Sequence, residues 1–528
     1  MKYIKKHKEV FLLVLITSFV MIWMMSDPHL LGHDTKFHLA NIENLKNSIS
    51  WNNLFPVDAI VSNLSFDMGY GLYLFYPIMP HLLVAYLAKF LSLFLIDTYT
   101  TLSIFYVLIS IGSVLLIYQL SRKLSGNRLI AFFSGLIFLL IPYRIGTMTV
   151  RGSLNESMIS LFVPMILLSI LAWKEKNWKQ FYIFFVVGWI GLIWSHMTMA
   201  LYTFIFALPF LYYIRNDLKN KIALKRGILA VLIVTVVVIP GIVQTFSQDG
   251  YMTRLSLLQE NFLSWKDYLF MKSNYDWTVP YFIPIALILA LGVSLFTYLK
   301  SKNKDTYLNI LWIWIPVFIF MMSPCFPWRL LGLLSIVIVL LTPLMLQNKK
   351  LNKLFFLFLL VLLIQAIPFL QMLRNRPYRI NTIHIDDGRG NIVEYYPEEY
   401  LEYQSFFEIE DQSISIVSGQ AEVEILSNQT HDMRIKVETE DVTTLELPKI
   451  YYNGYVIEDD NNQRTKAVRS KHGRVEVTIS RSGTYHIYYR DLPIVTALKR
   501  VRLVVGMGLL LYFAITLWKN NYLHFYKK

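Results

Sequence analysis

Long apolar runs recur along the chain and are separated by short polar segments. Runs of about 16–22 residues occur from Val10 to Leu346 and beyond, and each could cross most of a hydrocarbon layer about 30 Å thick. The runs are continuously apolar, whereas the strands of a transmembrane β-barrel alternate apolar and polar residues. The pattern therefore predicts a polytopic α-helical membrane protein.

We expect about twelve transmembrane helices from these runs. The first run, which starts at Val10, lacks a small-residue cleavage site, so we interpret it as a retained helix and not as a signal peptide. The expected spans lie near residues 10–25, 99–120, 129–142, 157–173, 181–194, 197–214, 228–243, 279–299, 308–323, 330–346, 354–372 and 501–518.

The composition agrees with a membrane protein. The 528 residues are 55% hydrophobic and 16% charged, whereas a soluble protein carries about 25% charge. The formal net charge of +14 comes from basic clusters between the apolar runs, where such clusters orient a membrane protein, so we expect membrane lipids and no nucleic acid as partners. Cys325 is the only cysteine, which excludes an intrachain disulfide and a multi-thiolate metal site.

The basic clusters also predict the topology, because such clusters face the cytoplasm. Both termini are then cytoplasmic, and residues 26–98 form a large first outer loop. Residues 72–95 are apolar enough to span, but Pro77, Pro80 and His81 interrupt them. We therefore expect a re-entrant or interfacial hairpin on the outer face, covered by protein or lining a cavity.

A second outer segment differs in composition and predicts a separate domain. Several stretches alternate with period two, and turn residues such as Asn453-Gly454 and Ser482-Gly483 separate them. We expect an extracytoplasmic antiparallel β-sandwich over residues 374–495. It follows a transmembrane domain over residues 1–373 and precedes a transmembrane helix with a cytoplasmic tail over residues 496–528. The expected strands lie at 413–417, 421–426, 433–437, 474–479 and 484–489.

The first outer loop contains the earliest candidate for chemistry. If the stretch after Gly32 is helical, Asp34 and His38 lie at positions i and i+4 on one face. They could then share one proton or bind one metal ion, and Glu156 is the third candidate ligand. Asp34 is equally well placed to cap the helix, so the sequence leaves both interpretations open.

Four further polar residues lie at predicted outer ends of helices. Arg151 could bind phosphate oxygens, and Glu156 would occupy the first turn of a span, where a carboxylate also suits the helix dipole. His196 lies at an outer turn, where a histidine often has a structural role. Arg329 begins a helix, and because a cation there opposes the helix dipole, it needs another reason for its position.

The predicted topology strengthens the functional interpretation of all these candidates, because it places them on one side of the bilayer. Carboxylates that accept a proton and arginines that hold a phosphate are what a glycosyltransferase with a lipid-phosphate donor requires. Tyr70 and Tyr76 could stack on a sugar ring, although an interfacial aromatic belt explains them as well. No P-loop or dinucleotide fingerprint is present.

The chain resembles a known family at these residues. Gly32-His-Asp34, Gly69-Tyr-Gly-Leu-Tyr-Leu-Phe-Tyr-Pro77 and Phe326-Pro-Trp-Arg329 look like motifs of bacterial 6-pyruvoyl-tetrahydropterin synthase-related membrane proteins. These proteins are similar to YfhO-type members of the GT-C glycosyltransferase superfamily. His38, Arg151-Gly152 with Glu156, Ser195-His196, and the segments 391–397 and 447–455 in the predicted β-domain also fit.

The resemblance implies a polyprenyl-phosphate-linked sugar donor and an inverting transfer to a cell-envelope glycan or lipid, outside the membrane. It also implies an acidic residue in the first outer loop, at Asp34, as base or metal ligand, so a divalent metal cofactor is left open. No residue here supports pterin chemistry.

A transporter or flippase of a lipid-linked or anionic glycan is the alternative, with the same arginines binding the head group. Transporters tend to have two related halves and charges near the midplane. Here the charges gather at one face and no second half repeats the first. A scaffold that presents the β-domain is a third interpretation, in which the acids at the outer face would be dispensable.

The predicted topology can be tested by labelling intact cells with an impermeant thiol reagent. In a Cys325→Ser background, a cysteine placed at Ser92 should react, because residues 72–95 are predicted to face outward. A cysteine placed at Ser125 should react only after the cells are permeabilised. Labelling of the Ser125 site in intact cells would overturn the topology.

Overall fold

The chain forms two compact units in a computed structural model. Unit 1 comprises Met1–Leu54, Pro77–Ala230 and Glu260–Ile383, and unit 2 comprises Phe55–Tyr76, Val231–Gln259 and His384–Lys528. The structure describes residues 8–26, 32, 34–54, 59–61, 68–248, 283–301, 305–321, 327–374, 395–397, 399–400, 413–429 and 432–525.

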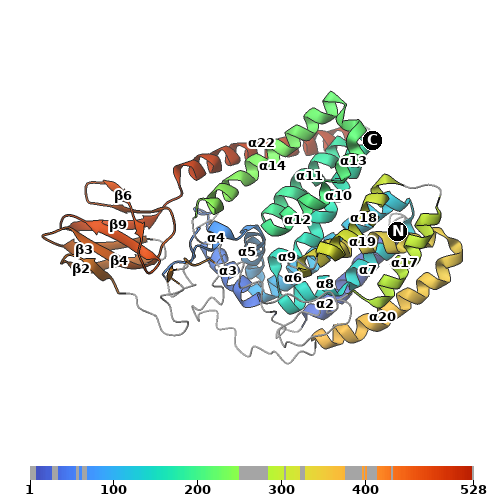
Figure 1. The fold of residues 1–528 in the computed structure, drawn as a ribbon, viewed down its shortest axis with the longest axis horizontal. Coiled ribbons are helices and arrows are strands. Elements are labelled where there is room, and N and C mark those ends of the chain that lie inside the picture. The colour runs from blue at the N-terminus through green and yellow to red at the C-terminus, as the bar shows by residue number, and fades with distance from the viewer. Residues whose placement is uncertain are drawn as a thin grey trace. The chain divides into compact units, whose positions relative to one another are not determined.

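Unit 1 is helical throughout the part of the chain that the structure describes (Figure 1). Its α-helices are α2 (Lys8–Met25), α3 (Thr35–Ser48), α5 (Met79–Leu91), α6 (Thr98–Ser125), α7 (Arg128–Leu140), α8 (Pro142–Gly146), α9 (Leu154–Ser157), α10 (Ile159–Lys174), α11 (Trp178–Ile193), α12 (Met197–Ala207), α13 (Phe210–Leu218), α17 (Ile285–Lys300), α18 (Thr306–Met321), α19 (Pro327–Leu341) and α20 (Asn352–Arg374). Short 3₁₀ turns are η1 (Ser92–Phe94), η3 (Thr342–Gln347) and η4 (Lys349–Leu351), while η2 (Thr147–Arg151) is a π-helical turn. Helix α14 (Lys221–Phe246) begins in unit 1 and ends in unit 2.

The predicted class of a multi-pass helical membrane protein is confirmed. Within the described residues a helix or a bent helix pair lies in each of the expected spans, while residues 279–282 and 322–323 of two spans lie outside the described residues. Among the described residues, six helices are long and apolar enough to cross a membrane, or up to eight if each bent pair is one span. The others, such as α11, α17 and α18, are shorter apolar helices. The six helices are Lys8–Met25, Thr98–Ser125, Leu154–Lys174, Lys221–Phe246, Arg329–Gln347 and Lys349–Ile367.

Prolines account for the two bent spans. Pro142 follows α7, and the helical segment that it opens is bent by 45° from α7. Pro209 lies between α12 and α13, which are bent by 62°. Proline has no amide hydrogen and its ring clashes with the preceding turn, so a helix changes direction there. The first bend leads the chain through the π-helical turn to Arg151.

The segment predicted as a hairpin forms two short helices, α4 (Leu72–Phe75) and α5, followed by η1. Helix α5 has 13 residues, which corresponds to about 20 Å and falls short of a full hydrocarbon layer. Together with η1 it forms an apolar helix, Met79–Phe94, that is as long as α17 and α18. The hairpin and the side of the membrane on which it lies therefore stay predictions.

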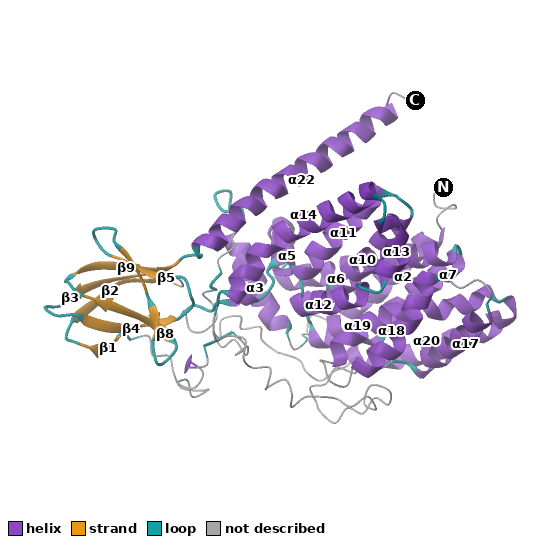
Figure 2. Ribbon diagram, turned by 45° about the horizontal axis from the view of Figure 1, so that its top comes forward, coloured by secondary structure: helices purple, strands orange, loops and turns teal. Residues whose placement is uncertain are grey.

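Unit 2 contains the antiparallel β-domain, which is also confirmed (Figure 2). One sheet has the order β1 (Ser415–Ser418), β4 (Thr443–Ile450), β8 (Arg474–Ile479), β7 (Val468–Arg469). The other has the order β2 (Glu422–Gln429), β3 (Asp432–Glu438), β9 (Gly483–Tyr489), β5 (Tyr455–Glu458), β6 (Arg464–Lys466), and every strand pair is antiparallel. Helix α22 (Pro493–Phe525) follows.

The sequence predicts those strands in which apolar and polar residues alternate with period two. In β3, Met433, Ile435 and Val437 are buried while the residues between them are exposed, so the pattern is visible in the sequence. Strand β4 is buried on nearly every residue and contains Pro448, which hides it from the same search. The positions of the five expected strands are thus confirmed, whereas β4, β5, β6 and β7 were not predicted.

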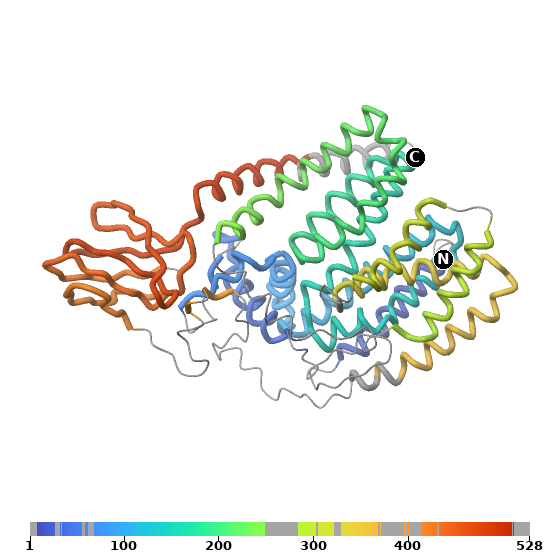
Figure 3. Tube along the Cα trace, viewed as in Figure 1, coloured from blue at the N-terminus to red at the C-terminus, as the bar shows by residue number. Residues whose placement is uncertain are grey.

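Part of the predicted first outer loop belongs to unit 2. The Met68 carbonyl accepts a hydrogen bond from the Ile450 amide at 3.0 Å, and the hydroxyl of Thr245, in α14, donates to the Leu74 carbonyl at 2.8 Å. The ring of Phe75 stacks on Tyr395, with centroids 5.2 Å apart. In the chain trace, the blue segment at residues 68–76 lies beside the start of the orange β-domain (Figure 3).

Gly71 is a position where this packing can be tested. A Cβ atom there would lie 2.6 Å from the ring of Tyr452, which is fully buried. Gly71→Ala should therefore destabilise unit 2 by about 1–3 kcal/mol through overpacking. Thermal unfolding of the purified protein and limited proteolysis of the β-domain would measure the loss.

Gly292→Ala in α17 is the matched control. A Cβ atom there meets nothing within 4 Å. Alanine is favoured over glycine in a helix by about 1 kcal/mol, so this variant should melt at or above the wild-type temperature. Wild-type stability of Gly71→Ala would show that residues 68–76 are not packed as described.

Candidate functional site

Two glycines allow the predicted first outer loop to touch the chain after α8. A Cβ atom on Gly32 would lie 2.4 Å from the Gly152 nitrogen, and one on Gly152 would lie 1.9 Å from the Thr35 hydroxyl. Gly152 also has a φ of +65°, which other residues rarely adopt. A hydrogen bond joins the two segments at this contact, since the Asp34 amide donates to the Arg151 carbonyl at 2.7 Å. Asp34 is thereby held next to Arg151.

Arg151 ends the π-helical turn η2 and joins two carboxylates. Its Nε lies 3.2 Å from Oδ2 of Asp34, and its Nη1 donates to Oε2 of Glu156 at 2.5 Å. The Asp34 side chain is 37% exposed and the Glu156 side chain is fully buried. One guanidinium therefore links an accessible acid to a buried acid, through the kind of charge-assisted contact that fixes geometry. Single π-helical turns inside helices are often found at functional sites.

Glu156, in α9, is surrounded by donors and cations. The Tyr143 hydroxyl donates to its Oε1 at 2.6 Å. Nε of Arg329, from α19, lies 3.8 Å from Oε2, and Nε2 of His196 lies 3.9 Å from the same atom. A buried carboxylate is stable only with such partners. The partner carboxylate also explains a cation at the start of α19, where the helix dipole opposes it.

His196 caps α12 through its ring. Its Nδ1 accepts a hydrogen bond from the Met199 amide at 3.4 Å, so the ring proton lies on Nε2, the atom that faces Glu156. Burial, reinforced by the charge of Arg329, lowers the pKa of His196 to about 3. His196 is therefore a neutral imidazole near Glu156, and the 3.9 Å between Nε2 and Oε2 is longer than a hydrogen bond.

His38 has a different role from the one expected. Its Nε2 accepts from the Leu154 amide at 3.2 Å, so the proton lies on Nδ1, which donates to Nε2 of His81 at 2.8 Å. Burial lowers the pKa of His38 well below its usual range, and the charges of His81 and Arg151 add to the effect. Both ring nitrogens are thus engaged away from Asp34. The expectation that Asp34 and His38 share a proton or a metal is therefore wrong in this structure.

The proposed metal ligands Asp34, His38 and Glu156 are likewise not arranged around one ion. No group of three or more His, Cys, Asp or Glu residues within the described ranges is placed to hold a metal. Asp34 and Glu156 contact Arg151, and the guanidinium lies between them where a cation would be needed. The arrangement of Asp34, His38 and Glu156 thus does not support binding of a divalent metal by these three residues.

The N-cap interpretation of Asp34 also fails. Asp34 occupies the N-cap position of α3, but its side chain makes no capping hydrogen bond. The carboxylate instead contacts Arg151. Its position is therefore explained by the ion pair and not by the helix end.

Sequence reasoning missed three residues that hold the cluster together. Tyr143 bonds to Glu156, and His81 bonds to His38. The side-chain amide of Asn155 donates to the carbonyls of Pro77 and Ser195, each at 3.0 Å, and so connects three chain segments. Asn155 lies directly before Glu156 in a polar stretch of the sequence. Its place in that stretch could have identified it as a candidate site residue.

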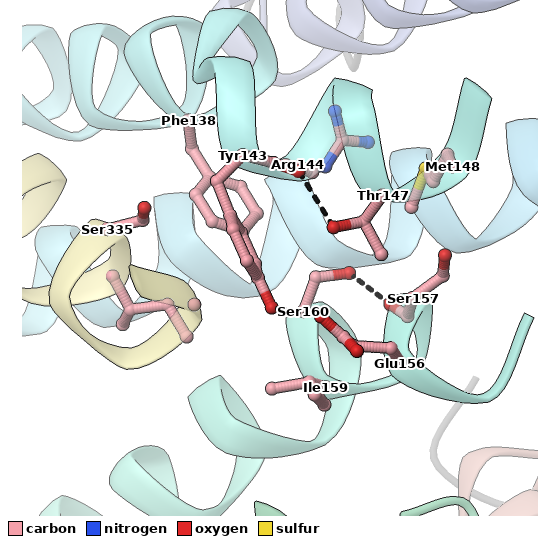
Figure 4. Close-up of a pocket in the computed structure, with 12 residues that line it drawn as sticks. Phe138, Tyr143, Arg144, Thr147, Met148, Glu156, Ser157, Ile159, Ser160 and Ser335 are labelled. Atoms are coloured by element: carbon pink, nitrogen blue, oxygen red, sulfur yellow. Dashed lines mark hydrogen bonds between the residues drawn. The ribbon is translucent and has the colours of Figure 1, made fainter. Parts of the chain in front are cut away.

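A small cavity of about 20 Å³ lies behind Glu156, with Tyr143, Thr147 and Ser160 among its lining residues. Figure 4 shows the Tyr143 ring extending toward the Glu156 carboxylate at this cavity. Arg144 also lines it and is buried. Its Nη1 donates to the Leu139 carbonyl at 3.2 Å, while Nε and Nη2 have no hydrogen-bond partner in the described part of the chain. A cavity of this size accommodates about one water molecule.

The two aromatic candidates lie in unit 2, whereas the charged cluster lies in unit 1. Tyr70 is 1% exposed and its ring packs 5.1 Å from that of Tyr396. Tyr76 is partly exposed, and the centroid of its ring lies 6.3 Å from that of the Tyr395 ring. Sugar stacking by these residues stays a prediction, and the burial of Tyr70 does not support it.

Fold and site together define a multi-pass helical membrane protein with an antiparallel β-domain and a buried arginine–carboxylate cluster. The chain belongs to the EpsG family, which matches residues 66–380.

A curated relative matches a shorter part of the chain. It is the dolichyl-phosphooligosaccharide-protein glycotransferase 2 of Pyrococcus horikoshii, 30% identical over 139 residues. The match covers 26% of this chain and 17% of the relative, so the chain corresponds to a small part of that protein.

Solved structures of the Archaeoglobus fulgidus oligosaccharyltransferase are also similar. The apo form has a TM-score of 0.42 at 11% identity, with 74% of this chain and 57% of that chain covered. The complex with Zn and sulfate has a TM-score of 0.43 at 12% identity, with 75% and 56% covered.

The neutral state of His38 predicts a pH-dependent stability. Because the folded-state pKa is lowered, only the unfolded protein binds a proton near the ordinary value of about 6.5. Stability is then complete above that pH and falls below it, by up to about 1.4 kcal/mol per pH unit. The thermal midpoint in detergent should therefore be lower at about pH 5 than at about pH 7.5.

His38→Gln is the comparison, because glutamine can donate and accept but does not titrate. Its thermal midpoint should fall less between the same two pH values, since the contribution of His38 is removed. Equal decreases in both proteins would show that His38 does not take up a proton on unfolding.

Proposed function

We propose that the protein is an inverting membrane glycosyltransferase of the GT-C type. It transfers a sugar from a polyprenyl-phosphate-linked donor to an extracytoplasmic acceptor, such as a cell-wall polymer or a glycolipid. The proposal is supported by the glycotransferase of Pyrococcus horikoshii, which is 30% identical over the matched segment. The motifs shared with 6-pyruvoyl-tetrahydropterin synthase-related and YfhO-type proteins agree with it.

One observation carries the proposal: Arg151 contacts an accessible carboxylate and a buried carboxylate at once. The buried acid, Glu156, neutralises and positions the cations around it. The accessible acid, Asp34, can reach a substrate because 37% of its side chain is exposed. The arrangement therefore offers a base and cations within one cluster, as a displacement at a sugar phosphate requires.

In the proposed reaction, Asp34 removes the proton from an acceptor hydroxyl. The resulting oxygen attacks the anomeric carbon, and the bond from that carbon to the lipid phosphate breaks on the opposite face. The phosphate leaves with the bonding electron pair, and Arg151 and Arg329 stabilise the charge. A single displacement of this kind inverts the configuration at the sugar.

The remaining residues of the cluster position these groups. Glu156 fixes the Arg151 guanidinium, and the Tyr143 hydroxyl donates to the Glu156 carboxylate. His38 binds the Leu154 amide at the start of α9, two residues before Glu156. We therefore assign Glu156 and His38 supporting roles, and His196 a place at the donor phosphate.

The proposed topology places both termini in the cytoplasm and the β-domain outside. The cluster and the β-domain then face the same aqueous compartment as the acceptor. We propose that the β-domain helps to select the acceptor, because the catalytic candidates all lie in unit 1.

Asp34→Asn tests the function. The amide keeps the size of the side chain but cannot accept the proton, so release of polyprenyl phosphate from a panel of polyprenyl-phosphate sugars should fall by about 10²–10⁴-fold. The variant should express and melt close to the wild-type temperature, because an exposed ion pair contributes only about 0–1 kcal/mol.

Asp97→Asn is the matched control. Asp97 caps α6 by accepting from the Thr100 amide at 2.8 Å and lies outside the cluster. Its replacement should leave turnover unchanged. Turnover of Asp34→Asn at the wild-type rate would remove Asp34 as the base. Binding of the donor by the wild-type protein without any turnover would instead favour the transporter alternative.

A further inference from the structure

An apolar groove of about 500 Å³ lies on unit 1 between α5, α6, α10 and α11. All of the residues that line it are apolar, among them Leu108, Met158, Phe162, Val187, Gly191 and Trp194. The volume falls in the range of ligand sites, about 300–1,000 Å³.

The groove is open along the sides of its helices. Leu108 and Val187 line it and remain exposed, on α6 and α11 respectively. Helices α6 and α10 belong to segments that are long and apolar enough to span a membrane. The hydrocarbon chain of a membrane lipid can therefore enter the groove from the bilayer without passing through water.

The inner wall is formed where α10 and α11 approach closely. A Cβ atom on Gly191 would lie 2.2 Å from the ring of Phe162, so only glycine permits this contact. A second glycine, Gly188, faces Ile166 in the same way, at 3.0 Å. The close packing of α10 against α11 thus forms the inner wall of the groove.

One end of the groove reaches the charged cluster. Met158 follows Glu156 by two residues, and Trp194 precedes His196 by two residues. The Asn155 amide connects the carbonyls of Pro77 and Ser195, which lie beside the groove residues Met79 and Trp194. The polar and apolar sites are therefore continuous through the same three chain segments.

We propose that this groove binds the isoprenoid chain of the lipid-linked donor, in the part next to the phosphate. The inference rests on the proposed function, because the occupant must carry an anionic head at the end of the groove where Arg151 and Arg329 lie. The groove directs that head to the arginines, and the chain's methyl branches fill a surface lined by leucine, valine and aromatic side chains. In a bilayer the gain comes from shape and positioning, since ordinary lipid tails are equally apolar.

Val187→Trp and Leu108→Trp, made separately, test this site because each narrows the groove. Wild-type protein should turn over a long-chain polyprenyl-phosphate sugar at least about tenfold more efficiently than a two-isoprene analogue. In both variants the efficiency with the long-chain donor should fall toward that of the analogue. The Leu229→Trp control lies on the exposed face of α14, outside the groove, and should keep the wild-type preference.

A second measurement does not depend on turnover. A polyprenyl phosphate with a photoreactive group near its phosphate end should label peptides of α5, α6, α10 and α11, and unlabelled polyprenyl phosphate should compete while phosphatidylglycerol should not. Equal competition by phosphatidylglycerol, or an unchanged chain-length preference in both tryptophan variants, would overturn the groove assignment. Specific labelling without turnover of any donor would overturn the proposed function and support the groove.

Discussion

The buried carboxylate of Glu156 is the constraint on which the site depends. A charge inside a helical membrane domain is tolerated only when cations and hydrogen-bond donors surround it, and removal of one partner of such a pair costs about 3–5 kcal/mol. Tyr143, Arg151 and Arg329 meet this requirement from different elements, and the neutral ring of His196 lies 3.9 Å from the same carboxylate. Satisfying one carboxylate therefore fixes the positions of α8, η2 and α19 relative to one another.

Close backbone contact connects this buried pair to an accessible acid. The glycines at 32 and 152 let two loops meet without side chains between them, and the hydrogen bond from the Asp34 amide to the Arg151 carbonyl sets their register. Arg151 can then contact both acids. Because Glu156 holds the guanidinium in place, the contact with Arg151 also holds the exposed carboxylate of Asp34 in place. A side chain on a loop thereby gains the precision that a catalytic base needs.

The sequence located the apolar helices because hydropathy is strong in membrane helices, and among the described residues six of them, or up to eight with the bent pairs, are long enough to span. It also grouped Asp34, Arg151, Glu156, His196 and Arg329, because polar residues at the ends of apolar helices are rare. It could not find Tyr143 or His81, which lie within apolar stretches and carry no separate signal. The i, i+4 spacing of Asp34 and His38 suggested a shared ligand, but Leu154 and His81 satisfy the imidazole instead. Spacing along a helix shows which side chains share a face, and partners distant in sequence decide what they bind.

The division of the first outer loop between the two units follows from the same physics. Residues 34–54 remain with the cluster because Asp34 and His38 bond to it, while residues 68–76 carry aromatic rings and backbone groups that pair within unit 2. One continuous loop thus contributes to the charged cluster and to the packing of the β-domain unit.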